Sequence, residues 1–224
     1  MRKTSFSLFG SLLLTITPLL FSCKQTAAPG QATQWRALFD GISTNGWQMT
    51  GPGELKFEDG ELVTHGGMGL FWYTREKFGD CQIHVVFKPT GEKDNSGVFI
   101  RIPNPPQDPW DAVHGGYEVQ IANHGEKWHR TGCLYSFSEA QNIVDAKIGE
   151  WNTMLITLDG PRTIVEVNGT VVTDFTEGQP VPEKKIWYEP NRGPRPLSGY
   201  IGLQNHGEKE RVHFKEVKVK RLNR

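Results

Sequence analysis

The sequence has no excess of charge of either sign, since its 224 residues include 25 Lys and Arg against 25 Asp and Glu. Binding to the phosphate backbone needs a basic surface, so this balance argues against a nucleic-acid partner. Long amphipathic helices are also lacking. The one long apolar run, residues 6–21, is broken by Pro18 and is too short for a good membrane span.

The N-terminus has the features of an export signal. Arg2 and Lys3 form a basic start before the apolar run, which ends in Leu20-Phe-Ser-Cys23. This ending resembles the lipobox of bacterial lipoproteins, and the resemblance implies that residues 1–23 are a lipoprotein signal and that Cys23 is diacylated. An ordinary signal peptide with a chance cysteine is the alternative.

A polar Ala/Pro/Gly tether, residues 24–33, follows the apolar run. Lys24 stands where the usual inner-membrane retention signal has Asp. We therefore expect an exported lipoprotein, anchored by its lipid in the outer membrane with a periplasmic or surface face. Residues 34–224 are expected to form a single domain.

Cysteine is scarce, with three in the chain. Removing Cys23 leaves Cys81 and Cys133, an even pair in an oxidising compartment. They form either a disulfide or two buried thiols, and the sequence does not decide between these because it does not give the Cα separation.

Short strand-like segments with turn signals fill most of the chain. Apolar residues alternate with others over residues 81–88, and Asp59-Gly60 and Asn168-Gly169 are typical of hairpin turns. A slip in the alternation near Lys215-Glu216 indicates a bulge. Together these patterns predict an all-β fold, a β-sandwich or jelly roll.

Two segments are less regular. Gly132-Cys-Leu-Tyr135 is predicted as a short strand. Pro103–Gly116 carries four prolines and Trp110 and is predicted as a long loop, which in a compact domain is often functional.

Polar residues on two predicted strands mark a candidate site. From Val98 to Ile102 the even positions are apolar and expected to face the core, which places Arg101 on the opposite face. Over residues 117–121 the same alternation places Glu118 and Gln120 opposite the core. These groups on one face suit a polyhydroxylated ligand, although an ordinary solvated sheet face also carries such residues.

Seven short motifs in order resemble the DUF1080 family, also called the 3-keto-disaccharide hydrolase domain. The resemblance covers roughly residues 35–222. It implies a concanavalin A-like β-sandwich (jelly roll) of two antiparallel sheets. The motifs are Leu38-Phe-Asp-Gly41 with Gly46-Trp47, Asp94–Arg101, Tyr117–Ile121, Thr131–Tyr135, Gly149–Asn152, Val167–Gly169 and Gly202–His206.

The family resemblance implies cleavage of glycosides that carry a ketone at sugar C3. Such a ketone acidifies the C2 proton, so a general base can remove it, the enolate expels the group at C1, and water adds back. This chemistry needs one base, a stabiliser of the enolate oxygen and help for the leaving group.

Matching motif positions implies roles for single residues. Glu118 is the candidate base, Arg101 holds the enolate oxygen or pairs with Glu118, and His206 is the candidate acid for the leaving group. Asn95, Gln120, Gln204 and Tyr135 are candidates to bind hydroxyl groups, and Trp72, Trp110 and Trp128 are candidate stacking platforms, with a place in the core as the alternative for each tryptophan.

A divalent metal ion is an alternative polariser of the ketone, although no HxH or HExxH spacing supports a tight zinc site. The implied partners are an oxidised glycoside and a sugar 3-oxidoreductase that supplies it. Relatives commonly have an acidic residue where this chain has Ala122-Asn123. This departure keeps open a non-catalytic, lectin-like module that binds glycans at the cell surface.

Overall fold

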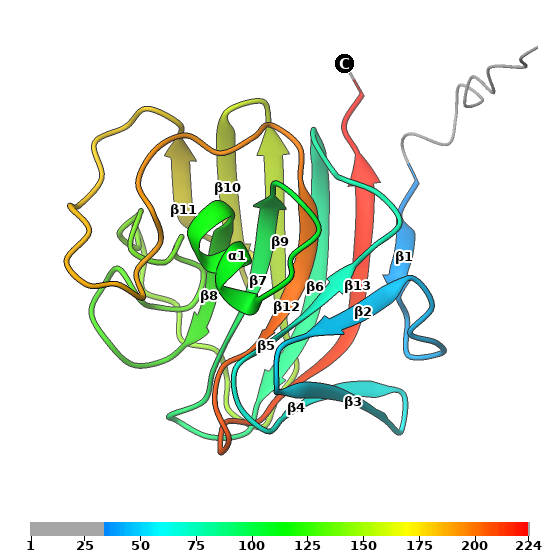
Figure 1. Cartoon of the computed structure of the whole chain (residues 1–224). Coiled ribbons are helices and arrows are strands. Elements are labelled where there is room, and N and C mark those ends of the chain that lie inside the picture. The colour runs from blue at the N-terminus through cyan, green and yellow to red at the C-terminus, as the bar shows by residue number, and fades with distance from the viewer. Residues whose placement is uncertain (1–33, 224) are drawn as a thin grey trace, which may run out of the picture.

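The computed structural model describes residues 34–223, which form two antiparallel β-sheets packed face to face (Figure 1). The expected signal segment, Cys23 and the tether lie outside the described residues and stay predictions. Within residues 34–223 no helix has the length and apolar character needed to cross a membrane.

The larger sheet has eight strands in the order β11-β10-β9-β6-β13-β4-β3, with β1 also paired to β13. Its strands are β1 (Arg36–Phe39), β3 (Glu54–Glu58), β4 (Glu61–His65), β6 (Cys81–Pro89), β9 (Asn152–Asp159), β10 (Arg162–Val167), β11 (Thr170–Thr176) and β13 (Val212–Arg221).

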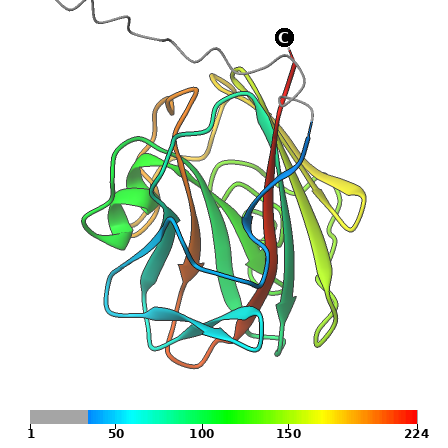
Figure 2. The same ribbon diagram turned by 90° about the vertical axis from the view of Figure 1, so that its right-hand side faces the viewer.

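The smaller sheet has five strands in the order β2-β5-β12-β7-β8. They are β2 (Trp47–Thr50), β5 (Gly69–Tyr73), β7 (Asn95–Ile102), β8 (Tyr117–Ala122) and β12 (Tyr200–Asn205). A helix, α1 (Pro109–Gly115), lies on the outer side of this sheet, away from the larger one (Figure 2). The predicted all-β sandwich of two antiparallel sheets is confirmed.

The core lies between the sheets and follows the predicted alternation. On β6 the residues at odd positions from Cys81 to Phe87 are buried and those at even positions are half-buried. Both predicted hairpin turns are present, and Asp59 and Asn168 each precede a glycine with positive φ, as a two-residue hairpin requires. The predicted bulge in β13 lies between Phe214 and Glu216.

The alternation predicted for β7 breaks at Arg101. Its φ of 57° and a register shift against β12 interrupt the strand after Ile100. The alternation therefore reverses, and Ile102 joins Phe99 in the outer cluster under α1. Arg101 is fully buried and donates to the carbonyls of Pro196 at 3.0 Å and Gly160 at 2.7 Å. The expectation that it shares the face of Glu118 is wrong.

Two local predictions also need correction. The proline-rich segment is not all loop, because Asp108 caps α1 in a capping box with Asp111, and Pro109 occupies the first turn. The segment Gly132–Tyr135 is not a strand but a series of turns, with a single bridge from Leu134 to Val119.

The two cysteines of the described chain are both free. Cys81 and Cys133 are completely buried, and burial raises the pKa of Cys81 to about 12 and that of Cys133 to about 11. The structure therefore favours two buried thiols over a disulfide.

We expect Arg101→Ala to lower the free energy of unfolding by about 2–4 kcal/mol, because it leaves a buried and a part-buried carbonyl group without donors and opens a cavity. Urea denaturation measures the change. Arg162→Ala is the control, since Arg162 pairs with Asp174 on the surface and its loss should matter little. An Arg101→Ala variant as stable as wild type would contradict the structural role.

Candidate functional site

A hollow of about 390 Å³ opens on the outer face of the five-stranded sheet. It is called the pocket below. Three strands, α1 and four loops contribute to it, and it brings together seven of the residues singled out in the sequence. Its lining residues are Met68, Asn95, Trp110, Val113, Glu118, Gln120, Tyr135, Trp187, Tyr188, Gln204 and His206.

Neighbouring strands supply the floor of the pocket. Asn95 comes from β7, Glu118 and Gln120 from β8, and Gln204 from β12. Their shared face follows from alternation, since the intervening residues of β8 and β12 are buried in the core between the sheets. Gly97, on β7, faces Gln120 of β8. A Cβ atom on Gly97 would lie 2.6 Å from Cγ and Oε1 of Glu118. The missing side chain gives the Glu118 carboxyl its space.

Glu118 is the central titratable group of the pocket. It is 8% exposed, and burial raises the pKa of its carboxyl to about 8. A hydrogen bond from the Gln204 amide works in the opposite direction and favours the ionised form. When the Gln120 amide is oriented with its nitrogen toward the two acceptors, it donates to Glu118 Oε1 at 2.7 Å and to Ser96 O at 3.2 Å. The carboxyl is thus held in a fixed orientation and can both hold and release a proton near neutral pH.

Two buried oxygen atoms on the pocket floor have no hydrogen-bond partner: Gln204 Oε1 and Asn95 Oδ1. An unsatisfied buried acceptor is costly, and such atoms are uncommon in folded proteins. Both residues line the pocket, so a small turn of either amide would present its oxygen to a hydroxyl group of a bound ligand. This arrangement suits a sugar.

Tyr135 and His206 stand at the side of the floor. Burial raises the pKa of Tyr135 to about 12, with the nearby Glu118 charge adding to the shift, so its hydroxyl stays a donor at neutral pH. The side chain of His206 is 45% exposed, and its Nδ1 lies 3.5 Å from Glu210 Oε1. His206 therefore sits at the rim, where a leaving group would meet solvent.

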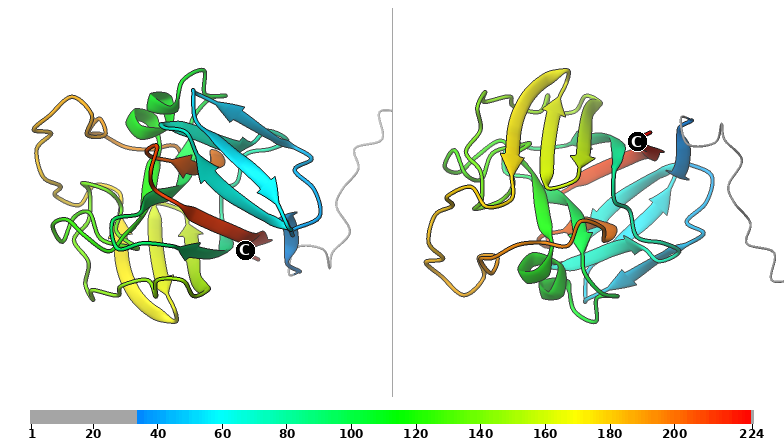
Figure 3. Two further views of the ribbon diagram at one scale, coloured as in Figure 1. Left: turned by 90° about the horizontal axis from the view of Figure 1, so that it is seen from below. Right: turned by 90° about the horizontal axis from the view of Figure 1, so that it is seen from above.

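Aromatic side chains that the sequence reading missed form the wall. Trp187 and Tyr188, in the long loop after β11, line the pocket, and Trp187 packs on Trp110 of α1 with ring centroids 4.9 Å apart. Their signal in the sequence was the run Ile186-Trp-Tyr188 inside a polar, proline-rich loop. Figure 3 shows this loop, in orange, reaching out beside the green segment that follows β8.

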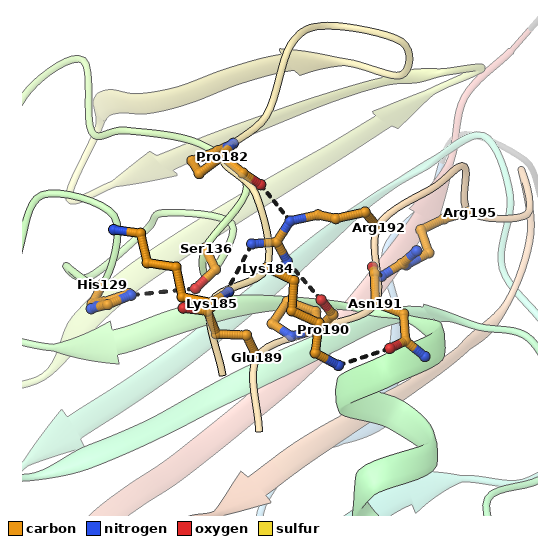
Figure 4. A network of polar contacts seen from close by, with 10 residues as sticks. All are labelled: His129, Ser136, Pro182, Lys184, Lys185, Glu189, Pro190, Asn191, Arg192 and Arg195. Atoms are coloured by element: carbon orange, nitrogen blue, oxygen red, sulfur yellow. Dashed lines mark hydrogen bonds and ion pairs between the residues drawn. The ribbon is translucent and has the colours of Figure 1, made fainter. Parts of the chain in front are cut away.

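Buried polar contacts fix this loop over the sheet. Arg195 donates to the carbonyls of Gly116 at 2.8 Å and Asn191 at 2.6 Å, and Glu177 accepts from Tyr117 and from the Arg195 backbone. Arg192 closes the loop on itself through Pro182, Pro190 and Glu189 (Figure 4). The wall is therefore a structured element.

Three predicted site residues lie outside the pocket. Arg101, near the end of β7, is buried and donates to backbone carbonyls, as described above. Trp72 is 5% exposed, donates to Thr50 Oγ1 at 3.2 Å and packs under α1, so it belongs to the outer hydrophobic cluster. Trp128 lines two neighbouring hollows instead.

The departure at Ala122-Asn123 has a structural explanation. The Asn123 amide pairs with both backbone groups of Ala146 and accepts from Thr131 Oγ1, which ties two loops together. Neither Ala122 nor Asn123 is among the pocket's lining residues.

Residues 34–223 contain no group of three or more His, Cys, Asp or Glu side chains arranged to hold a metal ion. The pocket itself offers Glu118 and His206 together with amide oxygens, which is not the donor set of a tight transition-metal site.

Comparison with known proteins identifies the class. Residues 34–220 match the family described as the 3-keto-alpha-glucoside-1,2-lyase-like domain, and the chain belongs to this family. Comparison with curated proteins gave no match.

Solved structures agree on the fold. A candidate glycosyl hydrolase from Parabacteroides distasonis ATCC 8503 is 25% identical, with a TM-score of 0.70 over 84% of this chain and 100% of that one. Another from the same organism is also 25% identical, with a TM-score of 0.62 over 84% of each chain. A Bacillus subtilis protein with a galectin-like fold is 14% identical, with a TM-score of 0.58 over 78% of this chain and 89% of that one, and shows the fold alone.

The pKa of Glu118 makes stability depend on pH. Because the folded state keeps the proton between the ordinary carboxyl value of 4.5 and about 8, it binds more protons than the unfolded state there, and the free energy of unfolding falls as pH rises through that window. We expect Glu118→Gln to lose this dependence and to be more stable than wild type at pH 9, by up to a few kcal/mol.

Urea denaturation of wild type and Glu118→Gln at pH 5, 7 and 9 measures this difference. Glu58→Gln on the exposed surface of β3 is the matched control, and it should follow wild type. Parallel pH profiles for wild type and Glu118→Gln would mean that the Glu118 pKa is not raised.

Proposed function

We propose that the pocket cleaves glycosides that carry a ketone at sugar C3, by removal of the C2 proton, elimination at C1 and hydration. The observation that carries the proposal is the enclosed Glu118 carboxyl with its pKa near 8, held by two amide donors under two unpartnered acceptors. The family's description points to the same chemistry.

The reaction begins when ionised Glu118 takes the C2 proton and the electron pair moves onto the C3 oxygen. The resulting enolate reforms the ketone by expelling the C1 substituent, and a C1–C2 double bond remains in the sugar. The expelled substituent takes a proton at its oxygen. Water then adds at C1 and a proton returns to C2, so the net reaction is hydrolysis.

The lining residues supply the other roles. Since Arg101 lies elsewhere, the Tyr135 hydroxyl is the donor to the enolate oxygen, because it stays protonated at neutral pH and lies close to Glu118. His206, at the rim, protonates the leaving oxygen. Asn95 and Gln204 accept from hydroxyl groups, and Trp110 and Tyr188 form the wall against the ring.

A two-carboxylate glycosidase mechanism fits this pocket less well. It needs an acid and a second carboxylate on opposite sides of the scissile bond. Among the described residues that line the pocket, Glu118 is the one carboxylate.

The cellular location and the source of the substrate are also proposals. We infer that the protein is exported and lipid-anchored through Cys23 at the cell envelope, on the basis of the lipobox-like end of its apolar run. Because sugars do not ordinarily carry a C3 ketone, an oxidoreductase must supply the substrate.

Purified full-length protein is expected to cleave a 3-keto-glucoside and not its unoxidised parent. Glu118→Gln should lower turnover about 10²- to 10⁴-fold, because it removes the base and little else. Product analysis by chromatography, with and without chelator, measures both effects and any dependence on metal. Glu58→Gln is the control.

Either of two outcomes would contradict this assignment. Full activity of Glu118→Gln would remove Glu118 as the base. Failure to cleave either glycoside, with retained glycan binding, would favour the lectin-like alternative. The fold is also similar to that of a carbohydrate binding module from Bacillus subtilis, which is an analogy of fold alone.

The rate should rise with pH. Since only ionised Glu118 is a base, and where removal of the C2 proton limits the rate, kcat/KM is expected to increase about tenfold per pH unit below about 8 and then level off. Gln204→Leu removes a hydrogen bond that favours the carboxylate, so the inflection should move to higher pH. An inflection near 4.5, or one that moves down in Gln204→Leu, would contradict the electrostatics described here.

A further inference from the structure

Two further hollows continue the pocket along the side where the segment after β8 meets the loop after β11. The middle hollow, of about 480 Å³, shares Tyr188 with the pocket. The outer hollow, of about 290 Å³, shares Trp128 with the middle one. The three hollows therefore follow one another with an aromatic residue at each junction.

Other contacts cross the same two junctions. The ring of His129 in the middle hollow lies 4.9 Å from that of Tyr135 in the pocket. The Arg192 guanidinium, in the middle hollow, lies 5.2 Å from the ring of Phe137 in the outer hollow. The hollows are thus adjacent, and the three together are called the groove below.

The chemistry of the groove suits a neutral ligand. The middle hollow carries acidic and basic side chains together, and Arg192 already donates to Pro182, Pro190 and Glu189 of its own loop (Figure 4). Burial lowers the pKa of His129, which favours the neutral form of its ring, and its Nε2 lies 3.3 Å from Ser136 Oγ. The two carboxylates that line the outer hollow, Glu139 and Asp174, are paired with Lys127 and Arg162. Among the described residues the charges along the hollows are therefore balanced and do not select a charged polymer.

Exposed aromatic rings supply the complementary surface. Tyr188 is 41% exposed, beside Ile186 at 42% and Trp187 at 66%, which concentrates large apolar side chains on a polar loop. A pyranose ring has an apolar C–H face and a polar edge, and Tyr and Trp offer the same combination.

We propose that the protein binds a neutral oligosaccharide of at least three units. The terminal unit occupies the pocket, the next units occupy the middle and outer hollows, and Tyr188 and Trp128 are the stacking platforms between them. This deepens the proposed function by giving the leaving group its own binding surface, and it rests on that function only for the terminal unit.

Affinity for unoxidised oligosaccharides tests the groove without any need for cleavage. Isothermal titration calorimetry of the full-length protein would use α-1,4-, β-1,4- and β-1,3-linked glucose oligomers of two to five units. In at least one series we expect affinity to rise about three- to tenfold with each hollow filled, and to level off after three or four units.

Trp128→Ala should remove most of that gain and Trp128→Phe should keep part of it, with thermal unfolding as the check on folding. Trp151→Ala is the matched control, because Trp151 packs under Lys88 and Lys215 and lines none of these hollows. It should leave the length dependence intact.

The outcomes separate this inference from the proposed function. Equal affinity for all lengths in every series, or a length dependence unchanged in folded Trp128→Ala, would overturn the groove even if 3-keto-glucosides are cleaved. Length-dependent binding without cleavage of 3-keto-glucosides would keep the groove and overturn the enzymatic proposal.

Discussion

Burial of a carboxyl group on the outer face of a sheet is the constraint on which this site depends. The outer face of an antiparallel sheet is usually solvated, and there Glu118 would be an ordinary surface acid. Here α1 and the loop after β11 cover that face, so the carboxyl is enclosed and its pKa rises. Amide donors from Gln120 and Gln204 satisfy the carboxyl in this setting, and Gly97 leaves the space for it.

The cover itself depends on buried guanidinium groups. Arg195 bonds the loop after β11 to the end of α1, and Arg101 bonds the bulge of β7 to the neighbouring loops. Each satisfies backbone carbonyls that would otherwise be buried without donors. The same contacts therefore stabilise the fold and set the pKa of Glu118, because loosening the loop would admit water to the carboxyl.

Alternation in the sequence placed Glu118 and Gln120 on one face, and the family resemblance added Asn95 and Gln204 to the pocket floor. Glu118, Gln120 and Gln204 lie in regular strands, where a period of two holds. The alternation failed at Arg101, because a residue with positive φ reverses the face of the residues that follow it in the strand. The loop aromatics Trp187 and Tyr188 had no periodicity to reveal their direction, since their position is set by distant contacts through Arg195. The helix α1 was predicted as loop, although the capping box of Asp108 and Asp111 and the proline in the first turn are sequence signals of a helix start.

A single carboxyl with a raised pKa also bears on which chemistry the pocket suits. Cleavage through an oxocarbenium-like transition state needs two carboxyl groups with different roles, and the described lining has one. Removal of a proton beside a ketone instead needs one base whose proton affinity approaches that of its target. Raising the pKa from 4.5 to about 8 narrows that gap while keeping a useful ionised fraction near neutral pH. The enclosure that makes Glu118 a poor surface acid is what makes it a suitable base for the proposed elimination.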